Sequence, residues 1–143
     1  MKIYIASDHG GFQLKSGLLK ELGHEYEFID LGCESEDSVD YPDYVDKLIE
    51  TFTPPEDIGI LICGSGQGMA IRANRYLHIR AALCWNREIV HLAREHNNAN
   101  VLCLPGRHLE IGQAVGIVKE FLQTPFAGGR HERRVNKLSK PID

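Results

Sequence analysis

Residues 58–68 read Ile-Gly-Ile-Leu-Ile-Cys-Gly-Ser-Gly-Gln-Gly, and this segment indicates the fold class. Residues 58–63 are almost entirely apolar, as expected for a parallel strand that is covered on both faces. The glycines that follow predict a tight turn, and the residues beyond it, up to position 75, fit a short helix. A buried strand that leads through a turn into a helix is the building unit of α/β proteins.

The same alternation of strand and helix extends in both directions from this segment. Short apolar runs predict further strands at 2–6, 25–29, 79–84 and 100–104. Helical spacing of apolar residues predicts helices at 11–22, 42–52, 87–96 and 110–122, and a last helix within the basic segment 128–140. We therefore expect one α/β domain over residues 1–143, a three-layer, doubly wound (Rossmann-like) fold with about five parallel strands. The expected strand order is 2-1-3-4-5.

Size, charge and hydropathy exclude several classes of protein. The chain has 143 residues, the size of one domain. Its formal net charge of -4 offers no basic surface, so nucleic acid is not an expected partner. No apolar run approaches the roughly 18 residues of a membrane helix. The apolar N-terminal stretch is too short for a secretion signal, so we expect a cytoplasmic protein whose four scattered cysteines are reduced thiols.

Two loops at the carboxyl ends of predicted neighbouring strands are candidates for a ligand site. Residues 7–11 read Ser-Asp-His-Gly-Gly, and residues 63–68 form the glycine turn. In the expected strand order these loops face each other across the crevice where the order reverses. The backbone N–H groups of such a turn can hold a phosphate or a developing oxyanion. The glycine spacing fits neither a P-loop nor a dinucleotide-binding loop, and a purely structural turn is an equally good interpretation.

Cys63 is the strongest single candidate for a catalytic residue, because it ends a strand and begins the glycine turn. At the N-terminus of a helix a thiolate is stabilised and accessible. A small buried hydrophobic residue is an equally good interpretation of Cys63. That structural role fits Cys84 and Cys103 on their apolar strands, and Cys33 is interpreted as loop filler.

Several basic and polar residues later in the chain are weaker candidates. His96 ends a helix and is followed by Asn97, and this loop can stand away from the crevice of its own subunit. Arg130 and Arg134 are four residues apart, so on a helix they share a face that can grip a phosphate. From spacing alone a solvated basic end is the better interpretation, and Arg107 is equally ambiguous. No His or Cys cluster has metal-ligand spacing, so no metal is expected.

Six motifs taken together resemble those of the type B ribose-5-phosphate isomerases, a family that includes the galactose-6-phosphate isomerase subunits. They follow the family's order over essentially the whole chain: Ser7-Asp8-His9-Gly10-Gly11, Asp40-Tyr41-Pro42, Cys63-Gly64-Ser65-Gly66, His96-Asn97, Asn100-Val101-Leu102 and Gly128-Gly129-Arg130-His131. Each motif is common alone, but six in order are specific. The resemblance implies an aldose–ketose isomerase of the pentose phosphate pathway, which interconverts D-ribose 5-phosphate and D-ribulose 5-phosphate without a cofactor or metal.

The resemblance also implies roles for individual residues. Cys63 corresponds to the base that moves a proton between C1 and C2 through an enediolate, His96 to the residue that helps to open the furanose ring, and Asp8 to a group that handles protons. The loop of Gly64, Ser65, Gly66, Gln67 and Gly68 corresponds to the enediolate-stabilising backbone, and the sugar and phosphate ligands to His9, Tyr41, Asn97, Arg107, Arg130 and Arg134. Family members are dimers or tetramers with sites at the dimer interface, so a partner chain can bring His96 and the basic segment.

One departure from part of the family concerns the base. A branch of the family has serine at the position of Cys63 and a glutamate base at the position of Met69. Because Met69 cannot accept a proton, Cys63 is the only candidate base on this loop. Two alternatives stay open: an isomerase of a six-carbon sugar 6-phosphate such as allose or galactose 6-phosphate, and a non-catalytic phosphate- or nucleotide-binding module. A thiol redox protein is disfavoured, since no resolving cysteine lies near Cys63.

Overall fold

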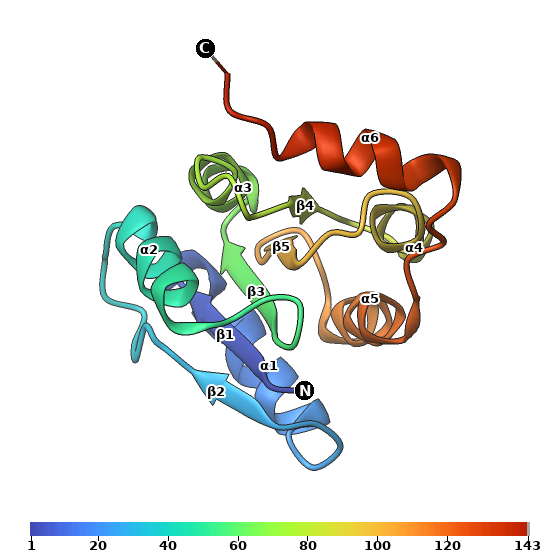
Figure 1. The fold of residues 1–143 in the computed structure, drawn as a ribbon. Coiled ribbons are helices and arrows are strands. Elements are labelled where there is room, and N and C mark those ends of the chain that lie inside the picture. Colours follow the sequence, from blue (N-terminus) through green and yellow to red (C-terminus); the bar gives the residue numbers. More distant parts are fainter. Residues whose placement is uncertain (143) are drawn as a thin grey trace.

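The predicted strands form one parallel sheet in the computed structural model, which describes residues 1–142 (Figure 1). Its strand order is β2-β1-β3-β5-β4, and every neighbouring pair is parallel. The strands are β1 (Ile3–Ser7), β2 (Phe28–Asp30), β3 (Ile58–Cys63), β4 (Ala81–Leu83) and β5 (Val101–Pro105). The expected doubly wound α/β fold is confirmed.

The expected strand order is wrong at one edge of the sheet. β5 lies between β3 and β4, because Cys103 pairs with Leu61 on one side and with Leu83 on the other. All residues of β5 are buried, whereas all residues of β4 are only partly buried. The longer, more apolar strand takes the inner position with both faces covered, and the short strand takes the edge. The reversal point between β1 and β3 is not affected by this exchange.

Helices cover both faces of the sheet, as a three-layer fold requires (Figure 1). The helices α1 (Phe12–Leu22), α4 (Arg87–Glu95) and α5 (Ile111–Gln123) enclose one apolar core with the sheet. The helices α2 (Tyr41–Thr51) and α3 (Gln67–Ala73) enclose a second core on the opposite face. A short 3-10 helix, η1 (His9–Gly11), connects β1 to α1.

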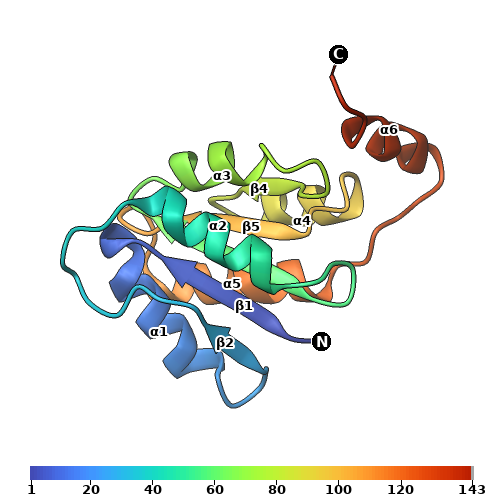
Figure 2. The same cartoon turned by 60° about the vertical axis from the view of Figure 1, so that its left-hand side comes forward.

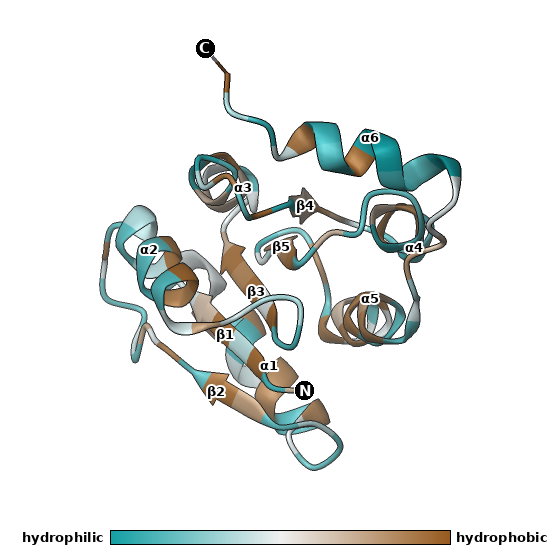
Figure 3. Cartoon of the chain, in the orientation of Figure 1, coloured by the Kyte–Doolittle hydropathy of each residue, from teal (hydrophilic) through white to brown (hydrophobic). Residues whose placement is uncertain are grey.

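The basic C-terminal segment forms the predicted helix, α6 (Arg130–Leu138). It stands off from the three layers (Figure 2), and most of its residues are hydrophilic (Figure 3). Val135 alone among its nine residues is buried. α6 therefore adds little to either core and leaves Arg130 and Arg134 exposed.

Candidate active site

The loops that follow β1, β3 and β5 meet through direct backbone contact at the carboxyl edge of the sheet. The Gly106 N–H donates a 2.8 Å hydrogen bond to the Cys63 carbonyl. A Cβ atom at Gly106 would lie 3.1 Å from the Cα of Gly11, and one at Gly11 would collide with the Ile62 carbonyl. Only glycine permits this approach, so the floor of the crevice between β1 and β3 is made of main chain.

The glycine turn directs a backbone donor at the Cys63 sulfur. The Gly66 N–H donates to Cys63 Sγ at 3.2 Å, and the cysteine side chain is only 5% exposed. Gly66 has a φ of 76°, and a Cβ there would lie 2.6 Å from Leu83 Cδ1 and 2.9 Å from the Leu104 main chain. Glycine is therefore required at this position. The turn therefore fixes the position of the Cys63 sulfur relative to the backbone.

The other three cysteines differ from Cys63 in their surroundings. Burial raises the pKa of the Cys84 thiol to about 12 and that of Cys103 well above its ordinary value, so both stay neutral as structural residues. Cys33, expected as loop filler, is also buried, and its Sγ donates to the Ser35 carbonyl at 3.2 Å. Of the four cysteines, only Cys63 lines the hollow at the carboxyl edge.

This hollow has a volume of about 480 Å³ and brings together most of the residues predicted for the reaction centre. Its lining residues are Asp8, Tyr41, Cys63, Gly64, Ser65, Gly68, Arg107 and His108. The Arg107 guanidinium covers two glycines, since a Cβ at Gly10 or Gly64 would lie 3.3 Å from it. His108 was missed by the sequence analysis, although its place just after β5, at the carboxyl edge, is a signal that could have identified it.

Asp8, which lines the hollow, and His9, which lies beside it, both accept hydrogen bonds from the backbone of the loops. Asp8 is 6% exposed, and its Oδ1 accepts the Gly11 N–H at 3.1 Å. His9 is not part of the lining, and its Nδ1 accepts the Val39 N–H at 3.2 Å, which leaves the proton of a neutral ring on Nε2. Gln67 is exposed and lies outside the lining, and Gly66 takes part only through its N–H.

The remaining predicted residues lie at the opposite edge of the sheet. Helices that connect parallel strands run back toward the amino edge, so His96, at the end of α4, lies there. Its ring stacks on that of His131 in α6, with ring centres 4.2 Å apart and planes 12° apart. Desolvation, and then the neighbouring His96, Arg130 and Arg134, lower the pKa of His131. In Figure 2, α6 lies toward the end of the sheet at which the chain begins.

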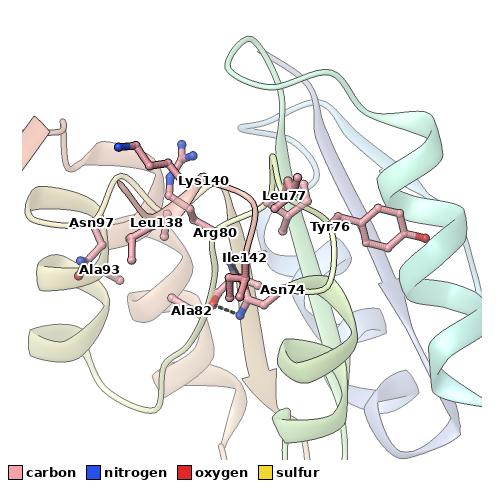
Figure 4. Close-up of a pocket in the computed structure, with 13 residues that line it drawn as sticks. Asn74, Tyr76, Leu77, Arg80, Ala82, Ala93, Asn97, Leu138, Lys140 and Ile142 are labelled. Carbon is pink, nitrogen blue, oxygen red and sulfur yellow. Dashed lines mark hydrogen bonds between the residues drawn. The ribbon is translucent and has the colours of Figure 1, made fainter. Parts of the chain in front are cut away.

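Asn97 lines a second hollow, which also measures about 480 Å³ and lies between α3, α4 and the end of the chain (Figure 4). Arg80, Leu77, Leu138 and Lys140 line it as well. Within one chain the predicted site is therefore divided into two halves. We call these the Cys63 half, at the carboxyl edge, and the His96 half, at the amino edge, which contains His96, Asn97, Arg130, His131 and Arg134.

Two negative findings apply to residues 1–142. No three His, Cys, Asp or Glu side chains in this part of the chain are grouped as metal ligands would be. None of its helices combines the length and the apolar character of a membrane span.

The Cys63 half is suited to moving a proton at a carbon atom. Cys63 can act as the base, and loop N–H groups next to it can stabilise an oxyanion as it forms. The Arg107 guanidinium and the Asp8 carboxylate add one charge of each sign to the wall of the hollow. Such a site is typical of proton transfer next to a carbonyl group.

Comparison with known proteins supports the same class of chemistry. A family model described as Ribose/Galactose Isomerase matches residues 3–138. The chain is 47% identical to the probable ribose-5-phosphate isomerase B of Mycoplasma pneumoniae, over 95% of this chain and 91% of that protein. It is 39% identical to the ribose-5-phosphate isomerase B of Mycolicibacterium paratuberculosis, over 98% of this chain and 91% of that protein.

Comparison with solved structures identifies the same family as the sequence relatives do. The ribose 5-phosphate isomerase of Thermotoga maritima superposes with a TM-score of 0.92 at 54% identity, over 96% of this chain and 97% of the other. The ribose-5-phosphate isomerase B of Mycoplasma genitalium, solved with bound ribulose-5-phosphate, gives a TM-score of 0.90 at 39% identity, over 96% and 93% of the two chains. Motifs, fold and relatives agree, and the chain belongs to the ribose/galactose isomerase family.

Proposed function

We propose that this protein is a type B ribose-5-phosphate isomerase that interconverts D-ribose 5-phosphate and D-ribulose 5-phosphate in the cytoplasm. The observation that carries the proposal is the Cys63 sulfur, which lies in the wall of a hollow, accepts the Gly66 N–H at 3.2 Å and shares the wall with Asp8. The similar isomerase of Mycoplasma genitalium binds ribulose-5-phosphate, which supports this choice of substrate.

In the proposed mechanism, Cys63 removes the proton from C2 of the open-chain aldose and returns it to C1. The resulting cis-enediolate carries negative charge on O1, and loop N–H groups of residues 64–68 stabilise it. Each such donor is typically worth about 3–4 kcal/mol of barrier. Asp8 moves the hydroxyl proton between O2 and O1, so one proton is transferred between carbons and one between oxygens. Protons and electrons therefore balance without a redox cofactor.

The His96 half prepares and holds the substrate in this proposal. Ribose 5-phosphate is mostly a closed furanose with no free carbonyl, so His96 first opens the ring. Arg130 and Arg134 bind the phosphate with Arg107, which fixes C1 and C2 relative to Cys63. His9, Tyr41 and Asn97 complete the contacts to the sugar.

The two halves lie at opposite edges of one chain, so we propose that they meet across an interface between two copies. A twofold pair of chains would place the His96 half of one chain over the Cys63 half of its partner, and would form two equal sites. The position of α6 supports this arrangement, because it stands off from its own layers with both arginines exposed.

The first test of the activity is turnover of ribose 5-phosphate by the purified protein in EDTA, with the Cys63→Ala variant alongside. Turnover by the wild type but not by the variant would support the reaction, the base and cofactor independence together. Turnover of allose or galactose 6-phosphate but not of ribose 5-phosphate would change the substrate and keep the mechanism. Full activity of the Cys63→Ala variant would refute the assignment of Cys63 as the base.

Mixing two inactive variants tests the shared site. Cys63→Ala and His96→Asn chains are unfolded together, refolded together and assayed with ribose 5-phosphate. If each site draws on two chains, random pairing makes half of the dimers mixed, each with one intact site, and restores roughly a quarter of wild-type activity. If each chain holds a whole site, the mixture only averages the activities of the two separate variants.

A further inference from the structure

A row of charged and polar side chains leads from α5 to His96. His91 in α4 lies between two carboxylates, with Nδ1 3.0 Å from Glu120 Oε2 and Nε2 2.9 Å from Glu95 Oε2. The second oxygen of Glu95, Oε1, lies 3.3 Å from His96 Nε2. Thr124 Oγ1 donates to Glu120 Oε2 at 2.8 Å and fixes the far end of the row. We call Glu120, His91 and Glu95 the carboxylate–histidine row.

The charge of His91 follows from its neighbours. Each of its ring nitrogens faces a carboxylate oxygen, and an ionised carboxylate can only accept hydrogen bonds. Both nitrogens must therefore donate, which makes the ring an imidazolium. The hydrogen bonds to Glu120 and then to Glu95 raise the pKa of His91, and the bond from His91 lowers the pKa of Glu120. The row is thus a cation held between two anions.

The position of Glu95 determines which nitrogen of His96 carries the proton. A carboxylate oxygen 3.3 Å from His96 Nε2 repels a lone pair on that nitrogen and favours a proton there, so in the neutral ring Nδ1 is the free acceptor. The backbone of Glu95 is also held in place, since the Ala127 N–H donates to the Glu95 carbonyl at 3.0 Å. The stacked ring of His131 covers one face of His96, so the ring is fixed by an edge contact and a face contact.

A purely structural role does not account well for the row. The side chains of His91, Glu95 and His96 are 42%, 38% and 38% exposed. Exposed ion pairs contribute about 0–1 kcal/mol to stability. The same geometry has a clear chemical use, because a carboxylate that orients a histidine and selects its tautomer is a common support for acid–base residues.

We propose that Glu95 is a positioning residue for His96, held in place by His91 and Glu120, and that it keeps Nδ1 of His96 free to act on the sugar. The inference rests on the ring-opening role proposed for His96. Ring opening breaks the C1–O4 bond, leaves its electron pair on O4 and turns the O1 hydroxyl into a carbonyl. One proton leaves O1 and one arrives at O4, and Nδ1 takes the first and delivers the second.

The test variant is Glu95→Gln, and the matched control is Glu88→Gln, which makes the same change at an exposed position in the first turn of the same helix. The His91 imidazolium attracts the single oxygen of the new amide, so the amide NH₂ turns toward His96 Nε2. An amide N–H next to Nε2 favours a lone pair on that nitrogen, so the proton moves to Nδ1. In ¹⁵N spectra at alkaline pH, the His96 ring should change from the Nε2–H to the Nδ1–H tautomer, and Glu88→Gln should leave it unchanged.

Kinetics in the two directions give the second measurement. Ribulose 5-phosphate cannot close a furanose, because its O5 carries the phosphate, so it enters the reaction without ring opening. Glu95→Gln should slow turnover of ribose 5-phosphate by about 10- to 100-fold, the usual effect of losing a partner that orients a histidine. Turnover of ribulose 5-phosphate should fall much less, and Glu88→Gln should match the wild type in both directions.

The double variant separates failure of this inference from failure of the proposed function. In a His96→Asn background, Glu95→Gln should cause no further loss if Glu95 acts through His96. If His96→Asn slows turnover of ribose 5-phosphate and of ribulose 5-phosphate equally, the ring-opening role of His96 is refuted, and this inference is refuted with it. If His96→Asn selectively slows ribose 5-phosphate but Glu95→Gln does not, or if Glu95→Gln leaves the tautomer unchanged, only the inference about Glu95 is overturned.

Discussion

The Cys63 half and the His96 half are built in different ways. The Cys63 half is centred on a continuous strand, turn and helix, the donor to its sulfur is a backbone N–H, and the sulfur is nearly buried. The His96 half comes from the end of α4 and from α6, and its groups are exposed or partly exposed side chains, of which His96 and His131 stack on each other. The first half has its geometry fixed by the fold of one chain. The second presents its side chains at the surface, as expected if a second chain completes the site in the proposed dimer.

The strongest test of this contrast is removal of the base. Cys63→Ala should lower turnover of ribose 5-phosphate by about 10²–10⁴-fold, the range for loss of a general base. Substrate binding should persist, because the phosphate contacts belong mostly to the His96 half. Steady-state kinetics and calorimetric titration with ribose 5-phosphate would check both points. Wild-type turnover would contradict the assignment of Cys63.

A glycine pair tests whether the backbone of the Cys63 half is as constrained as its contacts indicate. Gly66→Ala should lower the free energy of unfolding by about 1–3 kcal/mol, because φ is positive and a Cβ meets Leu83 and Leu104. It should also reduce turnover by displacing the donor to Cys63. Gly112→Ala on α5, where a Cβ meets nothing within 4 Å, should raise stability by up to about 1 kcal/mol. Urea unfolding and turnover would check the pair, and full activity in Gly66→Ala would contradict the account.

Removal of a proposed phosphate contact tests the His96 half and should have a smaller effect than removal of the base. Arg134→Ala should raise KM for ribose 5-phosphate about tenfold and leave kcat nearly unchanged, because the phosphate is bound equally in the ground and transition states. Arg133→Ala removes the same charge from the same helix and serves as the control. A defect in kcat alone, or equal effects of the two variants, would argue against a specific contact from Arg134.

The smallest expected effect is the pH dependence of stability due to His91. Its pKa is raised in the folded protein, first by Glu120 and then by Glu95. A group with a raised folded pKa stabilises fully below its unfolded pKa, and this contribution is lost as pH rises through the folded pKa. Wild type should therefore exceed His91→Gln in stability most at mildly acidic pH, with the gap closing at alkaline pH. Urea unfolding across this range is the measurement, and a gap that widens with pH would have the wrong sign.

The fold was predictable where local pattern decides it. Buried apolar strands and amphipathic helices alternate in the sequence, and each lies near its expected place. The order of the last two strands was not predictable from adjacency, because it depends on competition for the covered position. Arg80 interrupts the apolar run of 79–84, whereas 100–104 is apolar after Asn100. This difference favours β5 for the inner place and could have corrected the prediction.

The contacts of the candidate site could be predicted where its residues are close together in the sequence. The motif around Cys63 is contiguous, so a sequence pattern describes the sulfur, the turn and the donor together. The carboxylate–histidine row joins His91 to Glu120 across 29 positions, and no short motif contains both. His96 and His131 likewise meet only after α4 and α6 have been placed. Their role as one group could not be inferred from spacing.

The backbone floor of the crevice has a consequence for how such enzymes diverge. Gly11 packs against the Ile62 carbonyl and Gly66 against the Leu104 main chain, and these two approaches do not depend on the side chains of the rim. Substitutions at rim positions such as Tyr41, Arg107 and His108 can change the size and polarity of the hollow while the donor to Cys63 stays in place. A lineage can thus adapt to a longer or shorter sugar without rebuilding its chemistry. This separation fits a family described by both ribose and galactose.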